Sequence, residues 1–202
     1  MLLFMFTGVV EELGILINKV ELTDTVILTI NGSNITSHTS LGESIAVNGI
    51  CLSIIDMFKK YYFITEVTKE TINRSNIGRI SVGSKLNLER AICKNQRLNG
   101  HLVQGHVDGF GILVSRTYFK GWEVIRISLS NVLSRYVVQK GSVSLNGVSL
   151  TISSISNNWF EVSLIPTTLK LTNLGHIQLG TNINIEVDIF AKYIEKILFN
   201  LD

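Results

Sequence analysis

Apolar and polar residues alternate with period two along much of this chain, which is the spacing of a half-buried β-strand. In the first half the alternating runs are residues 26–30, 61–67 and 85–89, and in the second half residues 124–129, 159–165 and 182–187. Turn residues separate the runs, and they are mostly Asn and Gly, since the chain has 16 Gly and a single Pro. Short strands with turn signals at close spacing predict a small β-barrel or sandwich in each half.

An Asn-Gly pair stands inside one alternating segment of each half. Residues 47–53 read VNGICLS, and residues 145–151 read LNGVSLT. Asn-Gly is the strongest short signal for a two-residue type I′ hairpin, because both central residues of that turn need positive φ. After the turns we expect Cys51 and Ser53 on one strand face, and Ser149 and Thr151 on the equivalent face of the other half. Pattern alone favours solvent contact for these small polar residues over a binding surface.

The repeated phrase belongs to a longer internal duplication. SNIG at residues 75–78 matches TNLG at 172–175, and VGSKLNLE at 82–89 matches LGTNINIE at 179–186. Gly8 corresponds to Gly105 at the same offset of 97 positions. Stacked repeats have periods of roughly 20–50 residues, so this period has the size of a domain. We predict two similar domains, residues 1–97 and 98–188, that meet in the polar stretch CKNQRLNGH.

The last segment, residues 189–202, changes period. Its apolar residues are spaced i, i+3, i+4, i+7, i+8 and i+11, which is one stripe of an α-helix. They are Phe190, Tyr193, Ile194, Ile197, Leu198 and Leu201. The stripe predicts a helix that packs either on its own barrel or on another subunit.

Charge and composition narrow the function classes. The net charge is +2 and the basic residues are scattered, which argues against a nucleic-acid partner. No apolar run reaches the roughly 18 residues of a membrane span, and the start MLLFMF lacks a basic n-region. Cys51 and Cys93 form neither a metal quartet nor a disulfide framework. His101 and His106, five positions apart, would point to opposite strand faces, so we expect no metal site. From the absence of a long apolar run and of a leader pattern we expect no membrane partner and a cytoplasmic protein.

Collinear blocks from Met5 to about Asp188 resemble the riboflavin synthase family of the alpha-chain type. The blocks are MFTGVVEELG, VNGICLSI, EVTKET, LNLERA, GHLVQGHVDG, KGSVSLNGVSLT and NINIEVD. Because the resemblance starts at Met5, residues 1–4 are either an extension or the product of a misassigned start. The resemblance implies an all-β fold of two six-stranded antiparallel Greek-key barrels in tandem plus a C-terminal α-helix. It also implies a homotrimer, with active sites between the first barrel of one subunit and the second barrel of its neighbour.

The implied reaction is a dismutation without a cofactor. Two molecules of 6,7-dimethyl-8-ribityllumazine in one site become riboflavin and 5-amino-6-ribitylamino-uracil, because one of them transfers a four-carbon unit to the other. The duplicated phrase is then explained by the duplicated substrate, since each barrel holds one molecule.

The resemblance assigns substrate contacts to both barrels. In the first they are Phe6, Gly8, Val9, Val10, Cys51, Leu52, Ser53, Glu66, Val67, Thr68, Lys69, Glu70 and Thr71. In the second they are Gly105, His106, Val107, Lys140, Ser149, Leu150, Thr151, Ser163, Leu164, Ile165, Pro166, Thr167 and Thr168. The implied catalytic set is His106, Ser44, Cys51, Lys140 and Asp188. His106 is the first choice for proton handling, because the unperturbed pKa of histidine lies near neutrality. Ser44, Cys51 or water would help a nucleophile add to C7 of the acceptor.

Three positions depart from the family pattern. Ser53 stands where Thr is usual, Asn146 where Asp is frequent, and Thr167 where Glu is usual. These departures keep a second hypothesis open, a non-catalytic lumazine- or flavin-binding antenna protein on the same fold. Both copies of the repeated phrase, His106 and Lys140 persist, which favours the enzyme. A flavin-binding reductase barrel is disfavoured, since RTYF at residues 116–119 lacks the Ser of its Arg-x-Tyr-Ser signature.

Overall fold

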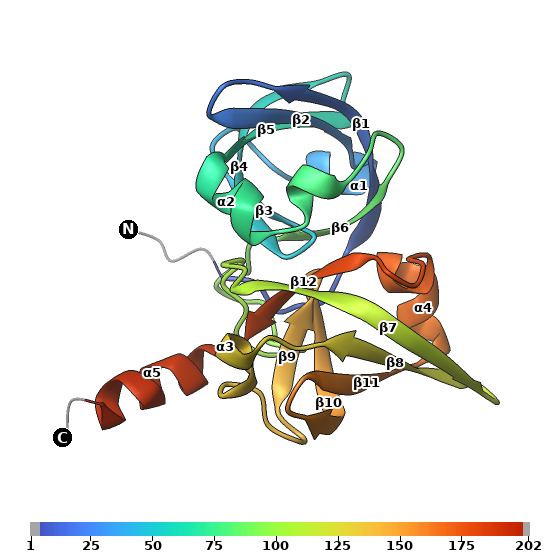
Figure 1. Ribbon diagram of the computed structural model, residues 1–202. Helices are drawn as coiled ribbons and strands as arrows, with labels where there is room; N and C mark the ends of the chain where they lie inside the picture. Colours follow the sequence, from blue (N-terminus) through green and yellow to red (C-terminus); the bar gives the residue numbers. More distant parts are fainter. Residues whose placement is uncertain (1–4, 200–202) are drawn as a thin grey trace.

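The computed structural model describes residues 5–199, which form two closed six-stranded β-barrels followed by a helix (Figure 1). The first barrel consists of β1 (Glu12–Glu21), β2 (Thr25–Asn31), β3 (Ser44–Val47), β4 (Ile50–Phe58), β5 (Tyr62–Thr68) and β6 (Lys85–Arg90). The second consists of β7 (Gly109–Phe119), β8 (Trp122–Ser128), β9 (Ser142–Leu145), β10 (Val148–Ser156), β11 (Trp159–Leu164) and β12 (Asn182–Val187). The predicted all-β tandem fold is confirmed. The question of residues 1–4 and the place of Leu201 lie outside the described residues.

Both barrels have the same strand order. Around the first barrel the order is β1-β2-β5-β4-β3-β6, and around the second it is β7-β8-β11-β10-β9-β12, with every pair antiparallel. The pairing of β2 with β5 and of β3 with β6 makes the Greek-key crossings. Closure removes the free sheet edges that an open sheet of this size would expose. The duplication in the sequence is therefore a duplication of complete barrels.

Short helices occupy equivalent places in the two halves. The first half has α1 (Ser33–Thr36), α2 (Lys69–Arg74) and the 3₁₀ turn η1 (Ile77–Arg79). The second half has α3 (Asn131–Ser134), α4 (Pro166–Leu171) and the 3₁₀ turn η2 (Asn173–Gly175). Pro166 begins α4, where its missing N–H costs no helical hydrogen bond.

Each barrel has its own hydrophobic core, and the period-two pattern explains both. In β2 the residues Val26, Leu28 and Ile30 point inward and are buried. Phe63 of β5 and Phe160 of β11 hold equivalent positions and are fully buried. Burying a side chain of this size contributes roughly 1.5–3 kcal/mol, so each barrel stabilises its own strands.

The two repeated turns pack against each other between the barrels. Asn48, Gly49, Asn146 and Gly147 all have positive φ, which confirms the predicted type I′ turns. A Cβ atom added to Gly49 would lie 2.6 Å from the backbone N of Gly147. Only glycine allows the two backbones to approach this closely, so the phrase is repeated partly because its copies form one junction.

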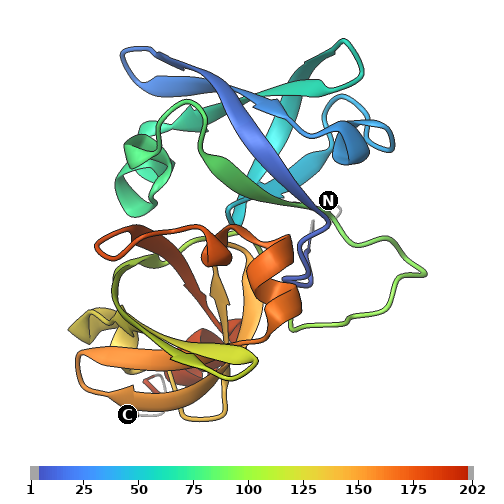
Figure 2. The ribbon, with the colours of Figure 1, turned by 90° about the vertical axis from the view of Figure 1, so that its right-hand side faces the viewer.

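The connection between the barrels, residues 91–108, contains no strand; its first part loops away from the barrels (Figure 2), and its second part returns to pack against them. The predicted boundary between residues 97 and 98 falls within it. Near the end of this connection Val103 pairs with Phe6 as an isolated antiparallel bridge. The first described residues therefore lie beside a segment almost a hundred positions further along the chain.

The C-terminal helix α5 (Ile189–Leu198) projects from the second barrel (Figure 1). Two ion pairs fasten one side of it, Lys192 with Asp108 at 2.5 Å and Glu195 with Arg135 at 2.7 Å. The apolar stripe is not buried within the chain. Its members Phe190, Tyr193, Ile194, Ile197 and Leu198 keep 57–62% of their surface exposed. Packing of the stripe on its own barrel is therefore not observed.

Candidate active site

The first candidate site lies on the outer face of β4. Ile50, Leu52 and Ile54 are buried in the core, whereas Cys51 and Ser53 face outward, as predicted from the alternation. Two adjoining cavities of about 210 and 420 Å³ share Cys51 and Thr71 in their lining. We call this surface the Cys51 site and define it by Cys51, Ser53, Glu66, Thr71 and His106.

The segment 105–107 belongs to this first-barrel site, although it was assigned to the second barrel from the sequence. The N–H of Cys51 donates to the carbonyl of Gly105 at 2.9 Å, and His106 lines the smaller cavity. Val107 packs against the core of the first barrel. A side chain at Gly105 would collide with Cys51, since an added Cβ would lie 2.6 Å from the Cys51 Cβ.

At the second candidate site the arrangement is reversed: a segment that precedes the first barrel contacts the second barrel. The N–H of Ser149 in β10 donates to the carbonyl of Gly8 at 2.8 Å, and Val10 packs against the core of the second barrel. Gly8 to Val10 were assigned to the first barrel, and the structure corrects that assignment as well. The reason is tertiary: the two leading segments pair at Phe6 and Val103, and each then continues onto the barrel of the other half.

His101 belongs to this second surface. Its Nδ1 lies 2.7 Å from the Ser149 Oγ, and its Nε2 is buried without a hydrogen-bond partner among the described residues. Burial lowers the pKa of His101, and the charge of Asp188 partly opposes that effect. We call the surface formed by Gly8, His101 and Ser149 the Ser149 site. The two histidines therefore lie at different sites, and the segment that carries them, residues 101–106, is not a continuous strand.

Several predicted contact residues are core residues instead. Leu52, Val67 and Leu164 point into the barrels, because the alternation places them on the inner face. Phe6 is fully buried with Ala46 and Val103. Their side chains are therefore not on either open surface, and only their backbone atoms can face a ligand.

The other predicted contacts lie on outward or helical positions. At the Cys51 site, Glu66 and Thr68 of β5 and Glu70 of α2 line the two cavities, and Lys69 is exposed beside them. The second barrel presents Thr151, Ser163, Ile165, Pro166 and Thr167 as exposed residues, with Val9 exposed and Leu150 and Thr168 half-buried.

Three members of the predicted catalytic set hold distinct places. Ser44 is buried on β3, and its side chain stabilises the thiolate of Cys51, although burial raises the pKa of that thiol overall. Asp188 is the N-cap of α5, where its carboxylate accepts the N–H of Phe190. Lys140 is exposed in the turn before β9 with φ 67° and lines neither cavity of the Cys51 site.

Sequence reasoning missed two buried carboxylates at the ends of the matched strands. Glu89 accepts the N–H and hydroxyl of Thr7 and the N–H of Gly8, at 2.6, 2.8 and 3.0 Å. Glu186 accepts the N–H groups of Gln104, Gly105 and His106, at 2.6, 2.9 and 3.0 Å. Burial raises the pKa of both to about 7, against the opposing effect of these hydrogen bonds. The available signal was a Glu at the same position near the end of both matched strands, KLNLER and NINIEV.

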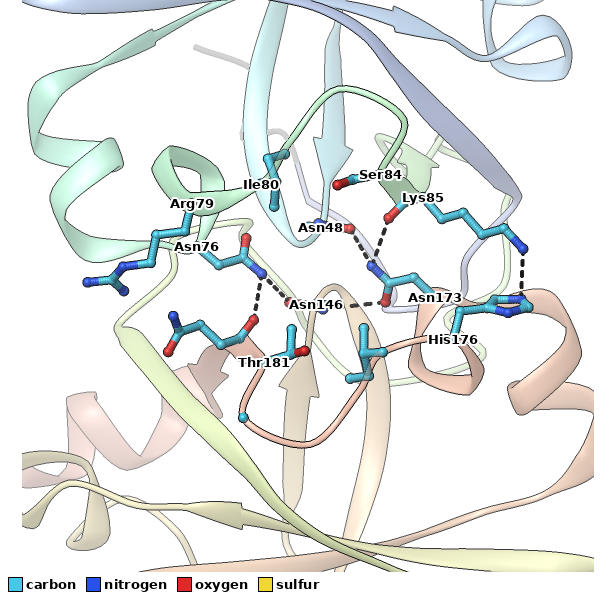
Figure 3. A pocket seen from close by; sticks show the side chains of 13 residues that line it. Asn48, Asn76, Arg79, Ile80, Ser84, Lys85, Asn146, Asn173, His176 and Thr181 are labelled. Atoms are coloured by element: carbon cyan, nitrogen blue, oxygen red, sulfur yellow. Dashed lines mark hydrogen bonds between the residues drawn. The ribbon is translucent and has the colours of Figure 1, made fainter.

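A groove of about 560 Å³ crosses the junction between the barrels and is separate from both sites (Figure 3). Asparagines line its floor in mirrored pairs. Asn173 Nδ2 donates to the Oδ1 of Asn48 at 3.0 Å, and Asn76 Nδ2 donates to the Oδ1 of Asn146 at 3.1 Å. Asn146 is thus a junction residue with its own counterpart, Asn48, so its departure from the family pattern does not alter the Cys51 or Ser149 site directly.

The described residues offer neither a metal-binding cluster nor a membrane-spanning helix. Within residues 5–199 no group of three or more His, Cys, Asp and Glu side chains is arranged to hold a metal ion. No helix in the same range is long and apolar enough to cross a membrane.

Comparison with known proteins matches both halves. The family model described as the lumazine binding domain matches residues 7–91 and again residues 104–188. A riboflavin synthase of Mycobacterium bovis is 48% identical over 197 residues, covering 96% of this chain and 98% of the relative. Riboflavin synthases of Actinobacillus pleuropneumoniae and Bacillus subtilis are 40% and 38% identical, each covering 96% of this chain and 90% of the relative.

Solved structures support the fold. A crystal structure of LumP complexed with riboflavin superimposes with a TM-score of 0.83, at 23% identity, covering 90% of this chain and 98% of that one. A crystal structure of LumP complexed with 6,7-dimethyl-8-(1′-D-ribityl) lumazine gives a TM-score of 0.82 at 22% identity over the same shares.

Proposed function

The chain belongs to the riboflavin synthase family, and we propose that it converts two molecules of 6,7-dimethyl-8-ribityllumazine into riboflavin and 5-amino-6-ribitylamino-uracil. One lumazine gives up a four-carbon unit and the other receives it. The single observation that carries the proposal is the pair of equivalent polar surfaces, the Cys51 and Ser149 sites, on two barrels of one topology. A reaction that consumes two copies of one molecule fits a protein that presents one binding surface twice.

Positioning is the main task of the protein in this reaction. The electron-poor lumazine ring stabilises a carbanion at its own C7 methyl, so the protein holds two rings together and moves protons. Holding two reactants in place lowers a barrier by up to roughly 7–11 kcal/mol. Acid–base assistance contributes typically about 10²–10⁴ in rate.

We assign proton handling to His106 because it is exposed and lines the smaller cavity beside Cys51. Ser44 acts through Cys51, whose thiolate its side chain stabilises, and this pair would assist the nucleophile at C7 of the acceptor. Asp188 would act on the Ser149 site through its charge on His101. Lys140 lines neither cavity of the Cys51 site, so we propose that it reaches a site in a neighbouring subunit.

We further propose a homotrimer in which each active site combines the first barrel of one subunit with the second barrel of another. The support is the apolar stripe of α5, which stays more than half exposed in the single chain. Exposed apolar patches of this kind mark interaction surfaces. Removal of residues 190–202 should lower the mass measured by light scattering from trimer to monomer, whereas Lys196→Gln, a polar exposed position of the same helix, should leave it unchanged. A truncated protein that stays trimeric contradicts the proposal.

The cytoplasm is the compartment we propose, since Cys51 and Cys93 are both free thiols. Thiols persist in a reducing compartment, whereas secreted proteins of small domains tend to pair them.

The test of the activity uses the purified protein and 6,7-dimethyl-8-ribityllumazine with no metal or cofactor added. Riboflavin should appear by absorbance at half the amount of lumazine consumed. Tight binding without product would instead support the second candidate, a lumazine-binding protein on the same fold, which the departures at Ser53 and Thr167 keep in view. The identity to riboflavin synthases, at up to 48%, against 22–23% to LumP, favours the enzyme.

A further inference from the structure

Glu186 holds the segment that completes the Cys51 site. This glutamate is 4% exposed and stands on β12 of the second barrel. Both carboxylate oxygens are used: Oε1 accepts the N–H of Gln104, and Oε2 accepts the N–H groups of Gly105 and His106. The carbonyl of Gly105 then accepts the N–H of Cys51 on the other barrel. Glu186 therefore sets the backbone from which the His106 side chain projects.

Glu89 does the same for the Ser149 site. It is 5% exposed on β6 of the first barrel, where Oε1 accepts both groups of Thr7 and Oε2 accepts the N–H of Gly8. The carbonyl of Gly8 accepts the N–H of Ser149 on the second barrel. Gly8 and Gly105 have φ of 77° and 76°, so the two held turns share one conformation.

We propose that Glu89 and Glu186 are positioning residues. Each binds a crossed segment, which is the stretch that precedes one barrel in the sequence but completes the active-site surface of the other barrel. Glu89 binds residues 7–8 at the Ser149 site, and Glu186 binds residues 104–106 at the Cys51 site. The expected effect on catalysis rests on the proposed function. The pairing of each glutamate with one site rests on the geometry alone. Neither residue touches the open surface, so each acts through the backbone it binds.

The chemistry of the clamp requires a carboxylate. Each glutamate faces backbone N–H donors with both oxygens, and the carboxylate accepts at both once it is ionised, which is at pH above the pKa of about 7 to which burial raises it. A glutamine in the same place turns an NH₂ group toward one of those donors, which leaves a buried N–H without an acceptor. Such a buried, unsatisfied donor is costly, so the segment should detach locally while the barrels stay closed.

The first experiment measures the reactivity of a single thiol with iodoacetamide and needs no lumazine. In a Cys93→Ser background Cys51 is the only thiol, because the chain has two cysteines. Glu186→Gln should raise the limiting alkylation rate of Cys51 at high pH by about tenfold, since Gly105 no longer covers it. Glu89→Gln, and Glu21→Gln as an exposed control, should leave that rate unchanged. The limiting rate is used because Glu186 also raises the pKa of Cys51 through its charge.

The mirrored experiment moves the thiol to the other site. In a Cys51→Ser, Cys93→Ser background, Ser149→Cys places the only thiol beside Gly8. Here Glu89→Gln should raise the alkylation rate and Glu186→Gln should not. Any other pattern overturns the proposal: an equal rise at both thiols means global loosening, and no rise at either means that the glutamates hold nothing at these surfaces.

The catalytic consequence is measured on the full chain with 6,7-dimethyl-8-ribityllumazine. Each glutamine variant should lower kcat/KM for riboflavin formation by about tenfold or more, because one of the two surfaces has lost its crossed segment. Wild-type kcat/KM in both variants overturns the role in the reaction. If the unmodified protein makes no riboflavin, the proposed function fails, whereas the two alkylation experiments still decide whether each glutamate holds its segment.

Discussion

The two barrels share one scaffold but present different chemistry. Their strand order, type I′ turns, buried glutamates and mirrored asparagines agree position for position. The open faces do not agree. The Cys51 site is lined by the carboxylates of Glu66 and Glu70, and the residues that occupy the same positions in the second barrel are Ser163 and Thr167. Under the proposed function, the two lumazine molecules would meet one surface with carboxylates and one lined by hydroxyls, and this difference would let one molecule act as donor and the other as acceptor.

The largest expected difference between the two sites is the effect of replacing their histidines on kcat. His106 is exposed at the Cys51 site, whereas His101 is buried against Ser149 with its pKa lowered by burial. His106→Gln should lower kcat by about 10²–10³, since acid–base assistance is lost. His101→Gln should lower kcat by about tenfold through loss of the Ser149 contact. Steady-state kinetics checks both, with the exposed His38→Gln as the control, and equal losses at the two histidines would contradict the assignment.

The contact between the two type I′ turns should contribute to the stability of both barrels. Gly49→Ala and Gly147→Ala should each lower the free energy of unfolding by about 3 kcal/mol or more, because a Cβ meets the opposite turn at 2.6–2.8 Å. Gly121→Ala is the matched control, since it has φ 94° and no heavy atom within 4 Å of an added Cβ. It should cost only about 1–2 kcal/mol. Chemical denaturation measures all three, and similar losses in every variant would mean that the turns do not support each other.

The buried glutamates predict a pH dependence that both barrels share. Burial raises the pKa of Glu89 and Glu186 to about 7, above the roughly 4.3 of an unfolded chain. The folded protein therefore binds more protons than the unfolded chain between these values, and stability falls as pH rises from about 4.5 to 7. The loss should be on the order of 2–3 kcal/mol for each carboxyl.

Denaturation at pH 5 and pH 7.5 measures this loss, and each glutamine variant should reduce the slope by its own share. Glu11 beside Glu89, and Asp108 and Lys192 beside Glu186, also contribute charge and are left unchanged. Stability that rises over this range would contradict the direction of the shift.

The smallest effect on catalysis concerns two departures from the family pattern. Asn146→Asp should change kcat by less than about twofold, because the new carboxylate keeps the acceptor for Asn184 and Asn76 in the junction. It should lower stability by about 1–3 kcal/mol, because the buried side chain loses its donor to the Asn173 Oδ1. Thr167→Glu, on an exposed position at the start of α4, should change kcat or KM without changing stability. Kinetics and denaturation on the two variants separate them, and a large kinetic effect of Asn146→Asp would place that residue in the active site.

Local chemistry made several features predictable. Period two predicted the strands, and NINIEV coincides with β12. Asn-Gly predicted both turns, because few other pairs adopt positive φ twice. The crossed segments were not predictable in this way. Gly8 precedes β1 and Gly105 precedes β7, so sequence order assigns each to the barrel that follows it, whereas the bridge between Phe6 and Val103 sends each to the other barrel.

The sequence by itself determined the two barrels, their turns, the amphipathic tail and the residue types of both sites, because alternation, glycine placement and side-chain chemistry are local properties. Only the tertiary structure decided which segment completes which site, that Asn146 lies in the junction, and that Glu89 and Glu186 are buried. These outcomes depend on contacts between residues 54 or more positions apart, such as Cys51 with Gly105 and Thr7 with Glu89, and such contacts leave no periodic trace in the chain.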